Sequence, residues 1–222
     1  MMEFNQQNRA FVLYPAVMNL LIANIVAFGA MQLLDTAKIY EYCALFPVGS
    51  PFFHVWQPLS YMFMHGDFSH LFFNMFALWM FGRGLEQEMG TKRFLLYYFV
   101  CGVGAALVQM AMAEIDLARF AEFSPAYYRY LYTPTVGASG AVFGLLLAFG
   151  MLHPNAVIML IFPPIPMKAK WFVMIYGLVE LLYGVSGSMD NIAHFAHLGG
   201  MFWGWLLLLW WRYRDRKRNY YY

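Results

Sequence analysis

A serine and a histidine, each flanked by glycine, are the residues of this sequence best suited to chemistry. Ser139 lies in the stretch Gly137-Ala138-Ser139-Gly140, at the start of an apolar segment. His197 lies in Ala196-His197-Leu198-Gly199-Gly200, near the start of a second apolar segment. A serine hydroxyl becomes a nucleophile when a base takes its proton, so this pair is the minimum that acyl-transfer chemistry requires.

The composition places these two residues in a membrane protein. Hydrophobic residues make up 62% of the 222 residues, aromatic residues 20% and charged residues only 12%. A soluble domain of this size needs a far more polar surface. Apolar runs are spread over the whole length without a linker or low-complexity region, so we expect a single domain over residues 1–222. We also expect it to be all-α, because helices satisfy their own backbone polar groups in lipid.

Six segments are candidates for membrane-spanning helices, which need about twenty residues to cross the hydrocarbon. The second is the weakest, because His70 and Asn74 interrupt it and the charged stretch 83–93 ends it. The fifth contains Glu180. The expected spans are 11–34, about 70–82, 94–113, about 136–153, 171–185 and about 192–211. The sequence therefore predicts a bundle of six transmembrane helices.

The basic residues predict an orientation, since they favour the cytoplasmic side. With six spans, both ends of the chain lie on one face, which takes eleven of the fourteen lysines and arginines: Arg9, Arg83, Lys92, Arg93, Lys168, Lys170, Arg212, Arg214, Arg216, Lys217 and Arg218. We expect both termini to be cytoplasmic. The basic C-terminal tail suits anionic lipid headgroups of the bilayer, and we expect no nucleic-acid partner.

The expected topology brings three polar residues to a similar shallow depth. His70, Ser139 and His197 each fall within the first turns of helices that enter from the outer face, at 1.5 Å of rise per residue. The fourth span is short, about sixteen residues or roughly 24 Å against a core of about 30 Å. We therefore expect Ser139 below the outer surface, in a depression that water reaches.

Small residues predict that the fourth and sixth spans touch. Gly140 and Gly144 form a small-xxx-small pair on one span, and Gly200 and Gly204 form another on the other span. Such pairs let two backbones approach closely. Glycines and a serine that merely pack helices are the alternative interpretation; a histidine at matching depth favours chemistry.

Taken together, these motifs resemble those of the rhomboid intramembrane serine proteases. The resemblance covers nearly the whole chain and rests on His70-Leu-Phe-Phe-Asn74, Gly137-Ala-Ser139-Gly140 and Ala196-His197-Leu-Gly-Gly200, in that order over six spans. The stretch 82–86, Gly-Arg-Gly-Leu-Glu, is also similar. The resemblance implies a rhomboid-like six-helix bundle and peptide-bond hydrolysis in the membrane.

Three positions depart from the family pattern or compete with it. Trp56 is followed by Gln57 where the family commonly has Trp-Arg, so some loop contacts are expected to differ. Phe143 stands where members often have a tyrosine that stacks on the histidine; it keeps the ring without the hydroxyl. His194 lies one turn before His197, and the motif assigns the base to His197, leaving His194 a structural role.

Ser139 and His197 are expected to act as a dyad, because no acidic residue accompanies His197 at helical spacing and Glu180 lies on another span. Ring stacking must then hold the imidazole. The backbone N–H of Ser139 lies at a helix start, which favours an oxyanion. The resemblance implies that His70 and Asn74, which share a helix face, point at the same oxygen; interhelical hydrogen bonding is the alternative. We expect His65 to brace the first loop.

Other classes of intramembrane protein are less well supported. A metalloprotease needs HExxH, which is absent, so we expect no metal and no cofactor. An aspartyl protease needs two aspartates within spans, whereas every aspartate here falls in a loop or at an end. Glu180 supports a transporter, because ionisable groups inside membranes are functional by default, but there is no internal repeat. An inactive rhomboid relative is a further alternative, which the presence of both serine and histidine disfavours.

The substrate follows from the recessed site and from the resemblance. A peptide bond reaches Ser139 only if a neighbouring transmembrane helix unwinds near its outer end. The resemblance adds single-pass membrane proteins as substrates. We expect lateral access past the fifth span, with the loop 187–191 capping the site. We expect an integral multi-pass protein of a prokaryotic cell membrane.

Overall fold

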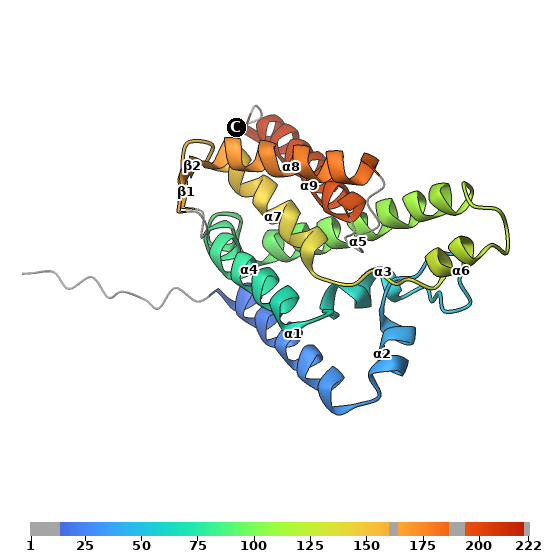
Figure 1. Ribbon diagram of the computed structural model, residues 1–222. Helices are drawn as coiled ribbons and strands as arrows, with labels where there is room; N and C mark the ends of the chain where they lie inside the picture. Colours follow the sequence, from blue (N-terminus) through green and yellow to red (C-terminus); the bar gives the residue numbers. More distant parts are fainter. Residues whose placement is uncertain (1–13, 160–163, 187–193, 220–222) are drawn as a thin grey trace, which may run out of the picture.

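The computed structural model describes residues 14–159, 164–186 and 194–219. Within these ranges, six helices of at least fourteen residues pack into a bundle (Figure 1). They are α1 (Pro15–Leu33), α4 (Phe68–Met89), α5 (Thr91–Leu117), α7 (Ser139–Leu152), α8 (Ala169–Ser186) and α9 (His194–Asn219). Their order matches that of the six predicted spans.

Shorter elements fill the connections. Between α1 and α4 lie α2 (Thr36–Cys43), α3 (Gln57–Ser60) and the 3-10 turn η1 (Tyr61–Phe63), and α6 (Pro125–Leu131) follows α5. Between α7 and α8, β1 (Val157–Met159) pairs antiparallel with β2 (Pro166–Lys168). This hairpin was not predicted. It brings the end of α7 back to the start of α8.

Helices α1, α5 and α8 are each long and apolar enough to cross a membrane, and α7 is a shorter apolar helix. Large hydrophobic side chains on the outside of the bundle are exposed, as at Val26 on α1 and Leu182 on α8. Such a surface suits lipid chains rather than water. The all-α membrane class is therefore confirmed, whereas the count of six crossings stays a prediction.

Two predicted helix ends are wrong, and side-chain contacts explain both. Helix α4 continues through Arg83 to Met89, because the Arg83 guanidinium lies 4.8 Å from the ring centroid of Trp79, one turn earlier. Helix α9 continues past Trp211 to Asn219, and an ion pair of 3.2 Å joins its Asp215 to Arg93 on α5. Charged residues that are paired with aromatic rings or with each other extend these helices instead of ending them.

Glu86 shows why the charged end of α4 is part of the bundle. Its carboxylate is buried and accepts hydrogen bonds from the backbone N–H groups of Ala16 and Val17, at 3.0 and 2.9 Å. These belong to the first turn of α1, whose N–H groups have no partner within the helix. Thr91 at the start of α5 donates to the same carboxylate at 2.8 Å. One side chain thus ties three helices together.

Gln57 takes the place of the arginine that the family pattern places after Trp56. Its side chain is fully buried in the segment between α1 and α4. The amide donates to the carbonyls of Phe52 and Glu41, at 2.7 and 3.1 Å, and its oxygen accepts from the N–H of Phe46 at 3.3 Å. A neutral side chain therefore organises this loop through three main-chain groups.

Helix α7 lies inside the bundle, between α4, α5, α8 and α9 (Figure 1). A Cβ atom on Gly200 of α9 would overlap the main-chain carbonyl of Gly140 on α7. The predicted close contact of these two helices is thereby confirmed. Gly204 differs from the expectation: its Cβ would meet Tyr97 and Cys101 of α5. The two glycines of α9 thus allow close contact with two different helices, α7 at Gly200 and α5 at Gly204.

The Gly200→Ala variant tests this packing. The added methyl group has to push α9 away from α7, which costs about 1–3 kcal/mol of unfolding free energy. We expect a lower Tm in detergent solution. Gly29→Ala is the matched control, because nothing lies within 4 Å of a Cβ at that position; its Tm should not fall. A Gly200→Ala protein as stable as the parent would contradict the close helix contact.

Candidate active site

Ser139 is the first residue of α7, and the chain that leads to it is held at two points. Thr135 and Leu45 exchange two backbone hydrogen bonds of 2.8 and 2.9 Å, and the N–H of Gly137 donates to the carbonyl of Tyr61 at 3.0 Å. Gly137 has a φ of +124°, a conformation that L side chains rarely adopt. The turn before Ser139 is therefore fixed by the loop between α1 and α4, and it requires glycine.

The imidazole of His197 meets the hydroxyl of Ser139. The distance from Nε2 to Oγ is 2.8 Å, which is a hydrogen bond between α9 and α7. Both residues are of intermediate burial. A base in hydrogen-bond reach is the arrangement that activates a serine nucleophile.

Phe143 holds the imidazole from one face. Its ring stacks on His197 with centroids 4.2 Å apart and an interplanar angle of 5°. Phe143 lies one turn after Ser139 on α7, so one helix supplies both the hydroxyl and the stacking ring. The hydroxyl of the tyrosine that the family pattern often has at this position is not needed for this contact.

The structure corrects the expectation that no carboxylate accompanies His197. The Glu180 carboxylate, on α8, lies 3.0 Å from His197 Nδ1 and 2.6 Å from His194 Nδ1. The 2.6 Å contact is a hydrogen bond. The 3.0 Å contact is bent and falls outside hydrogen-bond geometry. The expectation failed because helical spacing along α9 carries no information about α8.

His70 reaches the serine from α4. Asp67 caps the start of that helix by accepting the N–H of His70 at 2.8 Å. Nδ1 of the imidazole accepts the N–H of Gly66 at 3.4 Å, which leaves the ring proton on Nε2. A Cβ on Gly137 would lie 2.7 Å from this Nε2. The absence of a side chain at Gly137 therefore lets the N–H of His70 approach the turn before Ser139.

Asn74 lies one turn after His70 and is buried. Its amide donates to the main-chain carbonyl of His70 at 2.9 Å. This bond uses one of its two N–H groups and fixes the side chain on the same face of α4 as the imidazole. The structure thus brings together Ser139, His197 and His70, and it shows Asn74 as a support of the turn that carries His70.

His65 is fully buried beside His70, with ring centroids 5.1 Å apart. It precedes α4, in the loop where sequence reasoning placed it as a brace. Burial, with a smaller contribution from the neighbouring His70, lowers the pKa of His65 from 6.5 to about 4. His65 is therefore neutral at pH 7.

Glu180, His194 and His197 could also hold a metal ion. Among the described residues they form a group whose donor atoms lie within 4.8 Å of one another. One carboxylate and two imidazoles are donors that Zn²⁺ accepts. The direct hydrogen bond between Glu180 and His194 already satisfies the carboxylate without an ion.

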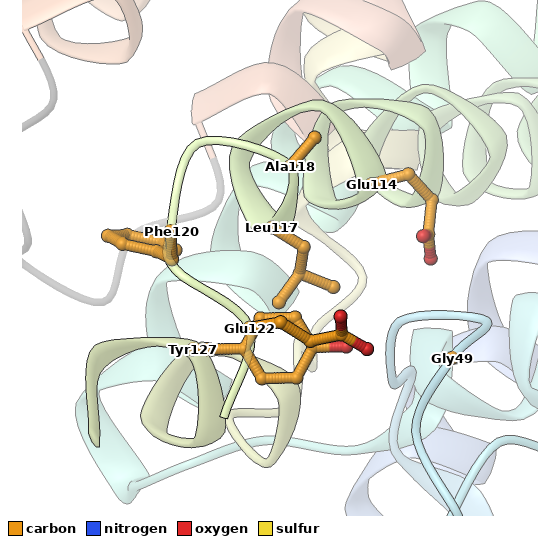
Figure 2. A pocket seen from close by; sticks show the side chains of 7 residues that line it. All are labelled: Gly49, Glu114, Leu117, Ala118, Phe120, Glu122 and Tyr127. Carbon is orange, nitrogen blue, oxygen red and sulfur yellow. The ribbon is translucent and has the colours of Figure 1, made fainter. Parts of the chain in front are cut away.

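A cavity of about 370 Å³ lies at the far end of α5, beside α6. Figure 2 shows the side chains of its lining, among them Glu114, Glu122 and Tyr127. Glu114 accepts the N–H of Val48 at 3.0 Å. None of the lining residues is a candidate for catalysis. The expected cap of the site, 187–191, lies outside the described residues.

Sequence reasoning missed Glu180 as a neighbour of His197 and Gly66 as a neighbour of His70. The distance of each residue from the end of its helix could have indicated that Glu180 and His197 lie at a similar depth. Glu180 lies six residues before the end of α8 at Ser186, and His197 lies three residues after the start of α9. At 1.5 Å per residue these are about 9 and 4.5 Å below the same face. Gly66 acts through its backbone N–H. Because every residue except proline has this group, the sequence gives no signal for its role.

Comparison with known proteins identifies the family. The family model described as the rhomboid domain matches residues 53–214, which is most of the chain. The chain belongs to the rhomboid family. The three motifs that carried the resemblance all fall inside the matched range.

Individual relatives support the same assignment. Rhomboid protein 1, mitochondrial, of Saccharomyces cerevisiae is 30% identical over 195 residues, which are 85% of this chain and 52% of that protein. Rhomboid protease AarA of Providencia stuartii is 27% identical over 189 residues, 83% of this chain and 61% of that protein. Rhomboid protease GluP of Bacillus subtilis is 29% identical over 154 residues, 67% and 24% respectively. The chain thus spans between about a quarter and three fifths of the length of these relatives.

The buried His65 predicts a stability that falls with acid. A histidine whose folded pKa is lowered stabilises the fold fully above its unfolded value near 6.5 and loses that contribution as the pH falls toward 4. The loss amounts to about 3 kcal/mol for a shift of this size. We expect His65→Phe to have a flatter Tm between pH 6.5 and 4 than the parent. Parallel Tm curves for the two proteins would show that His65 is not the group being protonated.

Proposed function

We propose that this rhomboid protein is an intramembrane serine endopeptidase that cleaves transmembrane segments near their outer ends. The observation that carries the proposal is the 2.8 Å hydrogen bond between Ser139 and His197. In the first step, His197 Nε2 takes the Ser139 proton as Oγ attacks the peptide carbonyl. The protonated imidazole then gives that proton to the leaving amine. In the second step, His197 takes a proton from the water that attacks the acyl-enzyme and returns a proton to Ser139 Oγ.

The oxyanion of the tetrahedral intermediate needs donors that are already in place. Ala138 offers no side-chain cap to α7, so the first N–H groups of the helix, including that of Ser139, are available to an anion. The Nε2–H of His70, directed at the turn of Gly137, is the second donor, and the free N–H of the Asn74 amide is the third. The oxyanion hole that we propose therefore takes three donors from two helices.

The substrates we propose are single-pass membrane proteins. A half-buried serine at the end of a short helix meets a peptide bond only where the substrate helix is unwound, so small and helix-destabilising residues should surround the cut. Helix α8 has the lowest buried share of the three long apolar helices, 17%. Its exposed position at the edge of the bundle supports lateral access of the substrate on that side.

The orientation we propose places both termini in the cytoplasm and the site on the opposite face. The basic residues that support it include Arg83 at one end of α4 and Arg214 in α9, whose guanidinium lies over the Trp210 ring. Residues of this kind anchor helix ends at a membrane surface. We assign the protein to a prokaryotic cell membrane; its relatives include bacterial and mitochondrial proteins.

Substitution of the catalytic pair tests the function. With a single-pass substrate in liposomes, Ser139→Ala and His197→Ala should each lower turnover at least about a thousandfold while the proteins stay folded. Ser186→Ala is the matched control, because its hydroxyl is exposed and donates to the carbonyl of Tyr183 in the same helix. Undiminished cleavage by the Ser139→Ala protein would overturn the proposed nucleophile.

Asn74→Ala tests the oxyanion assignment. Removal of one donor should lower kcat by about a hundredfold with little change in KM. Asn24→Ala is a close control, since the Asn24 amide makes the same bond to the carbonyl four residues earlier, at 2.7 Å, but lies on α1. If both variants lose the same activity, or if only KM changes in Asn74→Ala, the amide does not act on the oxyanion.

A further inference from the structure

We propose that Glu180 is a positioning residue for catalysis, which acts through His197 and makes the hydroxyl–imidazole pair a three-residue relay. This inference rests on the proposed peptidase function. It concerns a carboxylate that reaches the catalytic histidine from a third helix, on the side of the ring opposite Ser139. His194 completes the arrangement by holding the carboxylate.

The geometry places one polar group at each ring nitrogen of His197. Ser139 Oγ lies 2.8 Å from one ring nitrogen of His197, and a Glu180 carboxylate oxygen lies 3.0 Å from the other. The side chain of Glu180 is about one tenth exposed and that of His197 little more. The carboxylate therefore acts in a poorly hydrated site, where its field is weakly screened.

The first consequence is the choice of tautomer. A neutral imidazole carries one proton, and an ionised carboxylate only accepts hydrogen bonds. With Glu180 facing Nδ1, the proton resides on Nδ1, and the lone pair of Nε2 faces the hydroxyl of Ser139. The histidine is then ready to act as a base. In the other tautomer, Nε2 already carries a proton that points at Ser139, so this nitrogen cannot accept the proton of the hydroxyl.

The second consequence arises only during the reaction. When the Ser139 proton moves to Nε2, the imidazole of His197 becomes a cation and keeps its Nδ1 proton. The bent 3.0 Å contact then becomes an ion pair with Glu180, which stays ionised. An interaction that strengthens as charge develops accelerates the step, because it stabilises the transition state more than the resting state.

His194 and Tyr183 hold the carboxylate in place. Nδ1 of His194 donates to Glu180 at 2.6 Å, and the ring of Tyr183 stacks on His194 at 5.5 Å with an interplanar angle of 17°. His194 and His197 lie three residues apart and therefore on one face of α9. A carboxylate shared by two imidazoles of one helix cannot rotate away from His197 without losing the stronger bond.

The position of Glu180 in an apolar helix argues for function. An ionisable group within a membrane-spanning segment is expensive and needs a partner. If packing were its only role, a neutral residue would serve helix α8 better, because a buried ion pair rarely stabilises a fold. The carboxylate has two partners: His194, which forms a hydrogen bond with it, and the proposed catalytic base His197.

Glu180→Gln tests the relay, because the amide keeps the shape and loses the charge. It can also donate to Nδ1 and favour the wrong tautomer of His197. We expect kcat to fall by about 10²- to 10⁴-fold with KM nearly unchanged, since Glu180 does not touch the substrate. The rate at which a fluorophosphonate labels Ser139 should fall in parallel. Glu180→Asp, which retains the charge on a shorter side chain, should recover part of kcat even if Glu180→Gln is unstable.

Glu86→Gln is the matched control, because it removes a buried carboxylate whose partners are Ala16, Val17 and Thr91 rather than the proposed catalytic residues. It should lower Tm and leave the kcat of the folded protein unchanged. His194→Asn should give a smaller loss than Glu180→Gln, about tenfold, as expected for an indirect role. Parent-like kcat in Glu180→Gln, or equal losses in Glu180→Gln and Glu86→Gln, would overturn the relay.

Two further experiments distinguish the role of Glu180 from a failure of the peptidase function and from a metal site. Ser139→Ala, assayed in parallel, tests the peptidase function: if it is inactive while Glu180→Gln is fully active, the relay fails and the function stands. EDTA should leave the parent rate unchanged. A loss of activity in EDTA that Zn²⁺ restores would show that Glu180, His194 and His197 hold a metal, which contradicts the relay.

Discussion

The proposed active site depends on one close approach of two backbones. Helix α9 comes near enough to α7 because Gly200 has no side chain to strike the carbonyl of Gly140. Lipid provides no hydrophobic drive between helices, so contact of this kind relies on packing at short range. Three residues before Gly200 on α9 lies His197, and one residue before Gly140 on α7 lies Ser139. A few tenths of an ångström at the glycines therefore decide whether the hydrogen bond between hydroxyl and imidazole forms.

Around this contact, each polar group is oriented by a neighbour that itself has little freedom. The ring of Phe143 fixes the plane of His197, and Gly66 fixes the tautomer of His70. In the loop between α1 and α4, Gln57 holds three main-chain groups in a buried position. Such preorganisation matters in an apolar bundle, because polar groups there interact strongly and are costly when unpaired.

How far the sequence predicted this structure depends on the type of interaction. The order of the six long helices and the pairing of Gly140 with Gly200 follow from hydropathy and small-residue spacing, which are properties of single segments. The ends of α4 and α9 did not follow, because Arg83 and Asp215 find partners within the bundle. Glu180 was missed as a neighbour of His197, because its placement depends on how α8 packs against α9.

The central claim is that Ser139 attacks with His197 as base and with oxyanion donors from α4 and α7. A crystal structure of the protein inactivated by a fluorophosphonate measures this most directly. The account predicts phosphorus bonded to Ser139 Oγ, with the phosphoryl oxygen in hydrogen-bond distance of His70 Nε2 and the backbone N–H of Ser139. An adduct on another residue, or a phosphoryl oxygen directed away from both donors, would contradict it.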